Sequence, residues 1–282
     1  MLLKKIIFSS SSFITLQTSK RLFHSTTSNN APKKCAVLLA GSGVYDGSEI
    51  TEAVATLVHL SRHGADVQCF APDKMQLHTV NHTSGEEEEN NRNVLLESAR
   101  IARGDVKALS DLSSADFDCL VIPGGFGAAK NLFNADKTWA VNGPDGIVDE
   151  NVSNAINDFH HNNKAIGACC IAPVLLAKTI DGVSLTVGSS DTSNEAMWPY
   201  AGTAGQMESI GAKHVDAAFD EAVIDESNKV VTSAAYMYNG KPHEVFDSVG
   251  NMIEDVGVGV CGVKNEVSRW FRHRGNAGAG SD

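Results

Sequence analysis

The stretch 164–173 holds the residues best suited to covalent chemistry. Its apolar run 165–168 predicts a buried strand, and 171–178 predicts a helix with Pro173 in the first turn, where a missing N–H is harmless. A cysteine on a sharp turn between a strand and a helix is arranged as a nucleophile elbow. The helix N-terminus favours the thiolate, which is the nucleophilic form of the side chain.

Two cysteines, Cys169 and Cys170, occupy this turn. Neighbouring side chains diverge near the end of a strand, so only one of the two is expected to face a cleft. The alternative is that both are small buried hydrophobic residues, which is the usual fate of a free cysteine. Both interpretations stay open on this stretch alone.

The elements that must position this turn alternate between strand and helix. Further strands are predicted at 35–40, 66–70, 119–122, 185–187, 222–224 and 230–232, and further helices at 48–62, 149–161 and 242–260. Strands that are continuous apolar runs between helices are typical of a parallel sheet covered on both faces. We therefore expect an α/β fold with a doubly wound, mostly parallel sheet.

The N-terminal segment differs in composition from the rest of the chain. It is basic and rich in serine, and the first acidic residue is Asp46, which is the pattern of an organellar transit peptide. The segment 21–25 resembles a mitochondrial processing site, which predicts import into the matrix with cleavage near 23–25. We divide the chain into a transit peptide and linker at 1–31, one domain at 32–265 and a flexible tail at 266–282.

The charge balance narrows the class of partner. The chain has 23 basic and 34 acidic residues and a net charge of −11, which becomes −15 if the four basic residues before position 31 are removed with the leader. So acidic a domain argues against binding nucleic acid or an anionic membrane. None of the six cysteines forms a C-x-x-C pair, so a zinc ribbon is not expected, and no metal site is predicted.

A glycine-rich turn, Pro123-Gly-Gly-Phe-Gly127, follows the predicted strand 119–122. Its backbone N–H groups can converge on an anion, and beside a cysteine elbow they are what an oxyanion requires. We predict that Gly124, Gly125 and Phe126 bind the substrate oxygen together with Ile171. A tight turn that needs glycine's conformational freedom would look the same.

The segment 78–104 interrupts the alternation of strand and helix with an acidic run at 86–89. One interpretation is a solvated loop followed by an ordinary surface helix. The other is a wall or lid near the cysteine, with Arg92 or Arg100 facing the cleft and binding the substrate, because long insertions in compact domains are commonly functional.

These residues together resemble a family. The segments 122–132 and Cys-Ile-Ala-Pro at 170–173 resemble the ThiJ/PfpI group of the class I glutamine amidotransferase-like superfamily, whose fold is flavodoxin-like. The segments 43–50, 69–74, 92–95, 99–104 and 198–203 are similar to ElbB-type bacterial glyoxalases and their mitochondrial relatives. The resemblance runs from about residue 35 to residue 263.

The resemblance implies that Cys170 is the nucleophile and that a glutamate of the first helix lies against its sulfur. Counting back from the glycine that ends this helix gives Glu52. Helical periodicity instead favours Glu49, which lies nearer the apolar stripe formed by Ile50, Val54, Leu57, Val58 and Ser61. We favour Glu52, keep Glu49 as the alternative, and expect the glutamate to be protonated and Cys170 to be the most reactive cysteine with a favoured thiolate.

The sequence departs from relatives that carry a histidine directly after the nucleophile, since Ile171 stands there. A cysteine and a glutamate still permit a cofactor-independent glyoxalase, in which the thiolate adds to a small dicarbonyl such as glyoxal and glycolate is released. The alternatives are a glutaminase-type amide hydrolase and a non-catalytic redox-sensing or partner-binding protein. The expected partner is a small aldehyde, with a possible homo-oligomer and without an organic cofactor.

Overall fold

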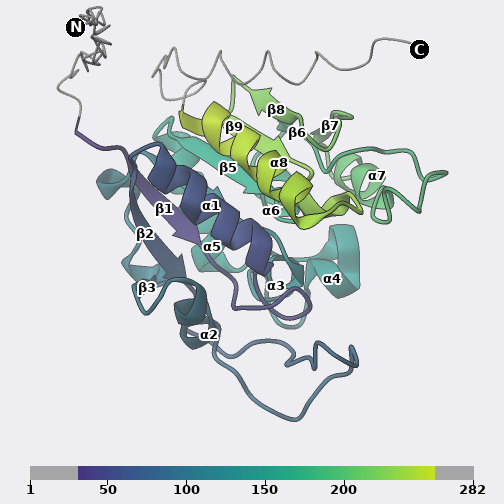
Figure 1. The fold of residues 1–282 in the computed structure, drawn as a ribbon, viewed down its shortest axis with the longest axis horizontal. Coiled ribbons are helices and arrows are strands. Elements are labelled where there is room, and N and C mark those ends of the chain that lie inside the picture. The colour runs from purple at the N-terminus through teal and green to yellow at the C-terminus, as the bar shows by residue number, and fades with distance from the viewer. Residues whose placement is uncertain (1–30, 258–282) are drawn as a thin grey trace, which may run out of the picture. The chain divides into compact units, whose positions relative to one another are not determined.

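A seven-stranded sheet forms the centre of the domain in the computed structural model, which describes residues 31–257 (Figure 1). The transit peptide with its cleavage site, the tail and the last residues of the predicted closing helix lie outside this range. The strand order is β3-β2-β1-β4-β5-β9-β8. The strands are β1 (Lys34–Leu38), β2 (Asp66–Ala71), β3 (Val106–Ala108), β4 (Cys119–Ile122), β5 (Ala165–Cys169), β8 (Ala222–Asp225) and β9 (Val230–Ser233).

The strands are parallel except for β8, which runs antiparallel to β9 at one edge. Strands β4, β5 and β9 are buried along their whole length, because helices cover both faces of the sheet. One face carries α1 (Ile50–Arg62), α2 (Val94–Ile101) and α8 (Pro242–Asp255), and the other carries α5 (Glu150–His161) and α6 (Pro173–Thr179) (Figure 1). The predicted doubly wound, mostly parallel α/β fold is confirmed.

Shorter elements complete the chain. Strands β6 (Ser184–Leu185) and β7 (Lys213–His214) pair in a separate two-stranded sheet, so the predicted strand 185–187 does not join the main sheet. The remaining helices are α3 (Phe126–Lys130), α4 (Trp139–Asn142) and α7 (Gly202–Glu208), with 3-10 turns η1 (Leu109–Asp111), η2 (Ser114–Asp116), η3 (Gly143–Asp145) and η4 (Ala235–Met237). Between residues 31 and 257 no helix is long and apolar enough to cross a membrane.

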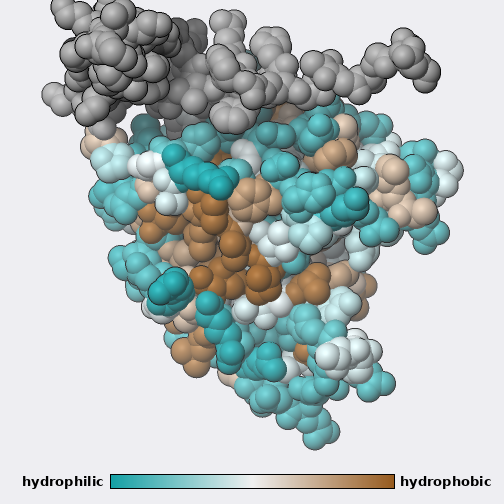
Figure 2. Space-filling view, in the orientation of Figure 1, coloured by the Kyte–Doolittle hydropathy of each residue, from teal (hydrophilic) through white to brown (hydrophobic). Residues whose placement is uncertain are grey.

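Helix α1 is rotated relative to the prediction from its apolar stripe. Its buried residues are mostly small or polar: Glu52, Ala53, Ala55, Thr56 and Leu60. Two residues of the stripe instead lie toward solvent, since Ile50 and Val54 are more than 40% exposed, whereas Leu57 is partly buried against the core. Figure 2 shows hydrophobic residues gathered on the face where α1 lies. The small buried residues allow α1 to pack closely against α8, where the His59 ring fills the space beside Gly250.

The segment 78–104 combines a loop with helix α2. Its loop lies against the turn that follows β1, because the His82 ring packs on Tyr45 with ring centroids 4.9 Å apart and accepts a hydrogen bond from the Tyr45 N–H. Neither arginine behaves as expected for a substrate-binding residue. Arg92 and Arg100 both approach the Glu97 carboxylate of α2, at 3.9 and 2.9 Å.

Candidate active site

The candidate site lies at the carboxyl ends of the central strands. The segments that follow β1, β4, β5 and β9 meet there. Strand order reverses at this point, because β2 pairs with one edge of β1 and β4 pairs with the other. This is the position at which parallel α/β sheets bind their ligands. The sequence separates the contributing residues by almost two hundred positions, and only the parallel order of the strands brings them together.

Cys170 occupies the sharp turn between β5 and α6. Its φ of 58° is in the left-handed region, which is strained for any residue other than glycine. The turn is held by the Cys170 N–H, which donates to the Ser233 carbonyl of β9 at 3.1 Å. Pro173 lies in the first turn of α6, as predicted, although the helix begins at this residue and not at Ile171. The strained conformation is what pushes the side chain out of the strand and into the cleft.

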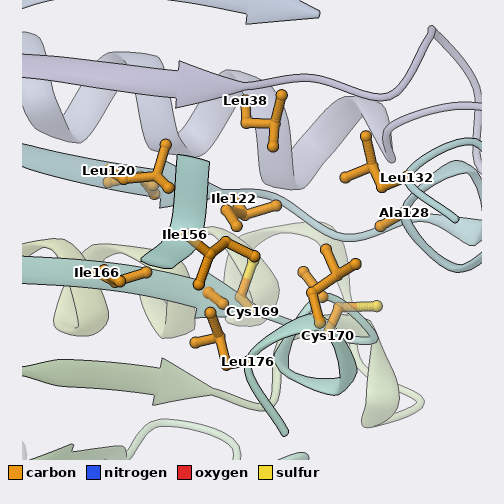
Figure 3. Packing of buried hydrophobic residues seen from close by; sticks show 14 of the residues in the cluster. Leu38, Leu120, Ile122, Ala128, Leu132, Ile156, Ile166, Cys169, Cys170 and Leu176 are labelled. Carbon is orange, nitrogen blue, oxygen red and sulfur yellow. The ribbon is translucent and has the colours of Figure 1, made fainter. Parts of the chain in front are cut away.

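The two cysteines have different environments. Cys169 is fully buried, whereas Cys170 lines the cavity at the strand ends. Figure 3 shows the sulfur of Cys169 among packed side chains near Ile156 and the sulfur of Cys170 pointing away from them. The expectation that only one of the pair faces a cleft is confirmed, and that residue is Cys170.

Glu52 is the first-helix glutamate that meets Cys170. The side chain is fully buried, its Oε1 accepts a hydrogen bond from the Tyr236 N–H at 3.1 Å, and its Oε2, which has no hydrogen-bond partner among the described residues, lies on the side of the Cys170 sulfur. A Cβ added to Gly124 would lie 2.7 Å from Glu52 Oε2 and 2.9 Å from the Cys170 sulfur. Only glycine at position 124 leaves room for the two side chains to approach each other.

Glu49 has a different role at the start of the same helix. It is the N-cap residue of α1, and its Oε2 accepts a hydrogen bond from the Glu52 N–H at 2.8 Å. The periodicity that favoured Glu49 as the partner of the sulfur is misleading, because the face of α1 turned to the site is lined by small and polar residues. Glu49 lines the cavity, and burial raises the pKa of its carboxyl.

The pKa values of both members of the Cys170–Glu52 pair are raised, which favours their protonated forms. Burial, reinforced by the charge of Glu49, raises the pKa of Glu52 to about 8, so a protonated glutamate is present as expected. Burial, followed by the charge of Glu52, also raises the pKa of Cys170 well above its ordinary value. The expectation of a thiolate favoured at rest is therefore wrong, since desolvation outweighs the helix N-terminus.

The predicted oxyanion donors behave differently from one another. A backbone hydrogen bond from Gly125 reaches the Cys170 sulfur. Among residues 31–257 the Ile171 N–H has no hydrogen-bond acceptor, so it is open to a ligand. The Phe126 N–H already donates to the Val44 carbonyl at 2.8 Å, and Phe126 faces the cavity with its ring. Gly124 contributes the space beside the sulfur and a carbonyl that accepts from the Glu49 N–H.

A cavity of about 370 Å³ opens over the sulfur. Its lining is dominated by side chains that the sequence did not indicate: Val44, Tyr45, Pro199, Tyr200, Tyr236, Met237, Tyr238 and Asn239. Of these, Val44, Tyr45, Pro199 and Tyr200 lie in segments quoted for the family resemblance, at 43–50 and 198–203. Tyr236, Met237, Tyr238 and Asn239 lie outside those segments and could not be assigned from the sequence, because short irregular segments carry no periodic signal.

The described residues limit the chemistry further. Arg92 does not line the cavity, because its guanidinium is held at the Glu97 carboxylate of α2. No histidine of residues 31–257 lines the cavity either, so a cysteine–histidine–acid triad is not formed by them. Within the same residues no group of three or more His, Cys, Asp or Glu side chains could hold a metal ion.

The protein has a doubly wound sheet, a strained turn that carries Cys170, and a buried glutamate beside the Cys170 sulfur. These features place it in the class of α/β proteins with a cysteine nucleophile elbow. Residues 33–239 match the model of the DJ-1/PfpI family, and the chain belongs to that family. A rat protein, "ES1 protein homolog, mitochondrial", is 49% identical over 243 residues, which cover 83% of this chain and 90% of the relative. The human "Glutamine amidotransferase-like class 1 domain-containing protein 3, mitochondrial" is 50% identical over 224 residues, covering 79% of this chain and 82% of the relative.

A solved structure supports the fold independently. The crystal structure of an "isoprenoid biosynthesis protein with amidotransferase-like domain" from Ehrlichia chaffeensis superposes with a TM-score of 0.70 at 36% identity, covering 80% of this chain and 98% of that chain. The resemblance to the ThiJ/PfpI group is thereby confirmed. The curated relatives are mitochondrial proteins, and the predicted mitochondrial localisation of this chain is confirmed with them.

Proposed function

We propose that the protein is a cofactor-independent glyoxalase, which converts reactive α-oxoaldehydes into 2-hydroxy acids in mitochondria. The observation that carries the proposal is the contact between the buried Glu52 carboxyl and the Cys170 thiol at the base of a cavity. A nucleophile that adds to a carbonyl and a carboxylate that moves a proton between adjacent carbons are the two groups that this isomerisation requires.

The first step is addition of Cys170 to the aldehyde. The reactive form is the one in which Glu52 has first lost its proton to solvent. The sulfur then forms a bond to the aldehyde carbon, and the thiol proton passes through the Glu52 carboxylate to the former carbonyl oxygen, giving a hemithioacetal. The Ile171 N–H is available to stabilise negative charge on that oxygen while the bond forms, and the Gly125 N–H, which contacts the sulfur at rest, lies beside the same position. Glu52 ends this step as a carboxylate.

The second step is an internal redox exchange between the two carbons of the substrate. Glu52 removes the hydrogen of the hemithioacetal carbon as a proton, and the electron pair left behind forms the double bond of an enediol. The same proton returns to the neighbouring carbon, while the hydroxyl proton of the first carbon moves to the second oxygen. One carbon is oxidised to a thioester and the other is reduced to an alcohol, so no external oxidant or reductant takes part.

The third step releases the product. Water adds to the thioester carbon, the carbon–sulfur bond breaks, and the sulfur regains a proton. The product is glycolate from glyoxal and lactate from methylglyoxal. The thioester lies in a cavity lined mainly by apolar side chains, so the water that hydrolyses it must enter after the aldehyde is bound. Until then the apolar lining keeps water away from the enediol and disfavours its loss.

The test is a side-by-side assay of glyoxal, methylglyoxal and glutamine with the wild-type protein, Cys170→Ala and Cys169→Ala. We expect glycolate and lactate from the wild type and from Cys169→Ala, whose sulfur points into the core, and none from Cys170→Ala. Release of ammonia from glutamine without turnover of either aldehyde would replace this proposal by an amide hydrolase. Aldehyde turnover that survives in Cys170→Ala would refute the assigned nucleophile.

A further inference from the structure

The cavity over Cys170 is larger than glyoxal needs. Glyoxal has four non-hydrogen atoms and takes up roughly 100 Å³ when each is given about the volume of a water molecule. The cavity measures about 370 Å³, which lies within the range of about 300–1,000 Å³ that is usual for ligands of drug-like size. A substrate that fills this space carries a substituent beyond its two carbonyl carbons.

The walls of the cavity are aromatic and well supported. The Phe126 and Tyr200 rings meet edge to face with centroids 6.1 Å apart at 80°. Tyr238 is stacked on Phe219 with centroids 4.8 Å apart and packs against Trp198 at 5.2 Å. Rings that are fixed in this way give a ligand flat apolar surfaces at little cost in side-chain entropy.

The charges around the cavity argue against a substrate with an anionic substituent. Within the described chain its lining contains no lysine, arginine or histidine, and its carboxyl group is that of Glu49. The nearby Lys130 does not line the cavity, and its Nζ donates to the Tyr45 carbonyl oxygen at 3.0 Å and sits 5.9 Å from the centre of the Phe126 ring. A phosphate or carboxylate on the substrate would be desolvated here without a cationic partner.

The groups of the proposed reaction lie together at one end of the cavity, whose lining also includes the polar side chains of Glu49 and Asn239. The Cys170 sulfur, the N–H groups of Gly125 and Ile171, and the Glu52 carboxyl gather where the strands end, and the rings of Tyr45, Phe126 and Tyr200 line the space in front of them. Two of these rings, Tyr45 and Tyr200, are about 40% exposed and therefore stand where the cavity opens. The site is thus polar at its base and aromatic toward its entrance.

We propose that the site selects α-oxoaldehydes that carry an aromatic or similarly bulky apolar substituent in preference to glyoxal itself. The statement on turnover rests on the proposed glyoxalase function. The aldehyde carbon is bound at Cys170, and the substituent lies between the rings of Tyr45, Phe126 and Tyr200. The shape and the missing cations explain the preference, since burial of an aryl group against these rings is favourable and burial of an anion is not.

The main test compares kcat/KM for glyoxal, methylglyoxal and phenylglyoxal. Each value is divided by the rate constant for addition of a free thiol to the same aldehyde, so that intrinsic reactivity cancels. We expect the corrected value for phenylglyoxal to exceed that for methylglyoxal by about tenfold or more, as for other apolar pockets that gain a buried group. Equal values, or a preference for glyoxal, would overturn the inference while leaving the glyoxalase function intact.

Variants of Tyr200 show whether the rings carry the preference. Tyr200→Ala removes the ring and should lower the corrected phenylglyoxal-to-methylglyoxal ratio by about tenfold, whereas Tyr200→Phe keeps the ring and should preserve the ratio. Leu96→Ala, at an exposed position of α2 that is not part of the cavity, is the surface control. An equal loss for both substrates in Tyr200→Ala would assign the effect to the shape of the site as a whole and overturn the inference.

A binding readout separates the two proposals. Benzaldehyde and acetaldehyde form reversible hemithioacetals that protect Cys170 from iodoacetamide without any turnover. We expect benzaldehyde to protect at a concentration about tenfold lower than acetaldehyde, after the same correction for intrinsic reactivity. Such protection without turnover of any oxoaldehyde would refute the glyoxalase function but support the preference for aldehydes with an aromatic substituent. Equal protection would refute the ligand class, whatever the turnover.

Discussion

Replacement of Glu52 by glutamine should stabilise the folded protein, and the gain should grow with pH. The Glu52 carboxyl is fully buried, and burial raises its pKa from 4.5 to about 8. An amide has the same shape, can accept the hydrogen bond from the Tyr236 N–H, and can donate to the Cys170 sulfur. The substitution therefore removes an ionisation while both contacts are retained.

The sign follows from the direction of the shift. A carboxyl whose pKa is raised on folding contributes its full stability below pH 4.5, and this contribution is lost as pH rises toward 8. With these two values the loss is about 1 kcal/mol at pH 5, about 3 kcal/mol at pH 7, and approaches about 5 kcal/mol above pH 8. Glutamine does not titrate, so the difference between the variant and the wild type should follow this curve.

Urea unfolding at pH 5, 6, 7 and 8 measures the difference, taken from the midpoint shift with a common denaturant slope. Glu208→Gln is the control, because it removes one negative charge at an exposed position of α7. A stability difference that stays constant between pH 5 and pH 8 would show that Glu52 does not titrate in this window, and the assignment of a protonated resting pair would fail.

Three further predictions follow from the same contacts. The value of kcat/KM for an α-oxoaldehyde should rise with pH and level off above about pH 8, because the Glu52 carboxylate is the form that accepts the proton; a profile that is flat from pH 6 to pH 9 would contradict this. Gly124→Ala should reduce kcat/KM by about a hundredfold or more with the fold retained by circular dichroism, because the new Cβ would lie 2.4 Å from the Cys170 Cβ; activity within about threefold of wild type would contradict it. Arg92→Ala should change kcat/KM by less than about twofold, since Arg92 faces Glu97. A large rise in KM would contradict this and show that Arg92 binds the substrate.

The fold could be predicted because its signals are local. Apolar runs such as 119–122 and the intervening helices specify a covered parallel sheet, and the elbow at Cys170 follows from a strand, a turn and Pro173 in sequence. The short strands β3 and β7 were missed, since two or three residues carry no periodic pattern.

The site was only partly predictable. Glu52 was found through a family resemblance, whereas periodicity pointed to Glu49, because it assumes that the apolar face of a helix is the buried one. In α1 the small residues are buried and Ile50 and Val54 are exposed. The raised pKa of the Cys170 thiol also could not be inferred, since it depends on burial that only the packed loops create.

The most direct test of the Cys170–Glu52 mechanism is a rapid acid quench during turnover of methylglyoxal, followed by peptide mass analysis. A hemithioacetal reverts on quenching and denaturation, but the thioester formed after the proton transfer survives acid. The mechanism predicts an adduct with the mass of methylglyoxal on the peptide that contains Cys170 in the wild type, and neither adduct nor lactate in Glu52→Gln. An equal adduct in Glu52→Gln, or lactate formed by that variant at the wild-type rate, would contradict it.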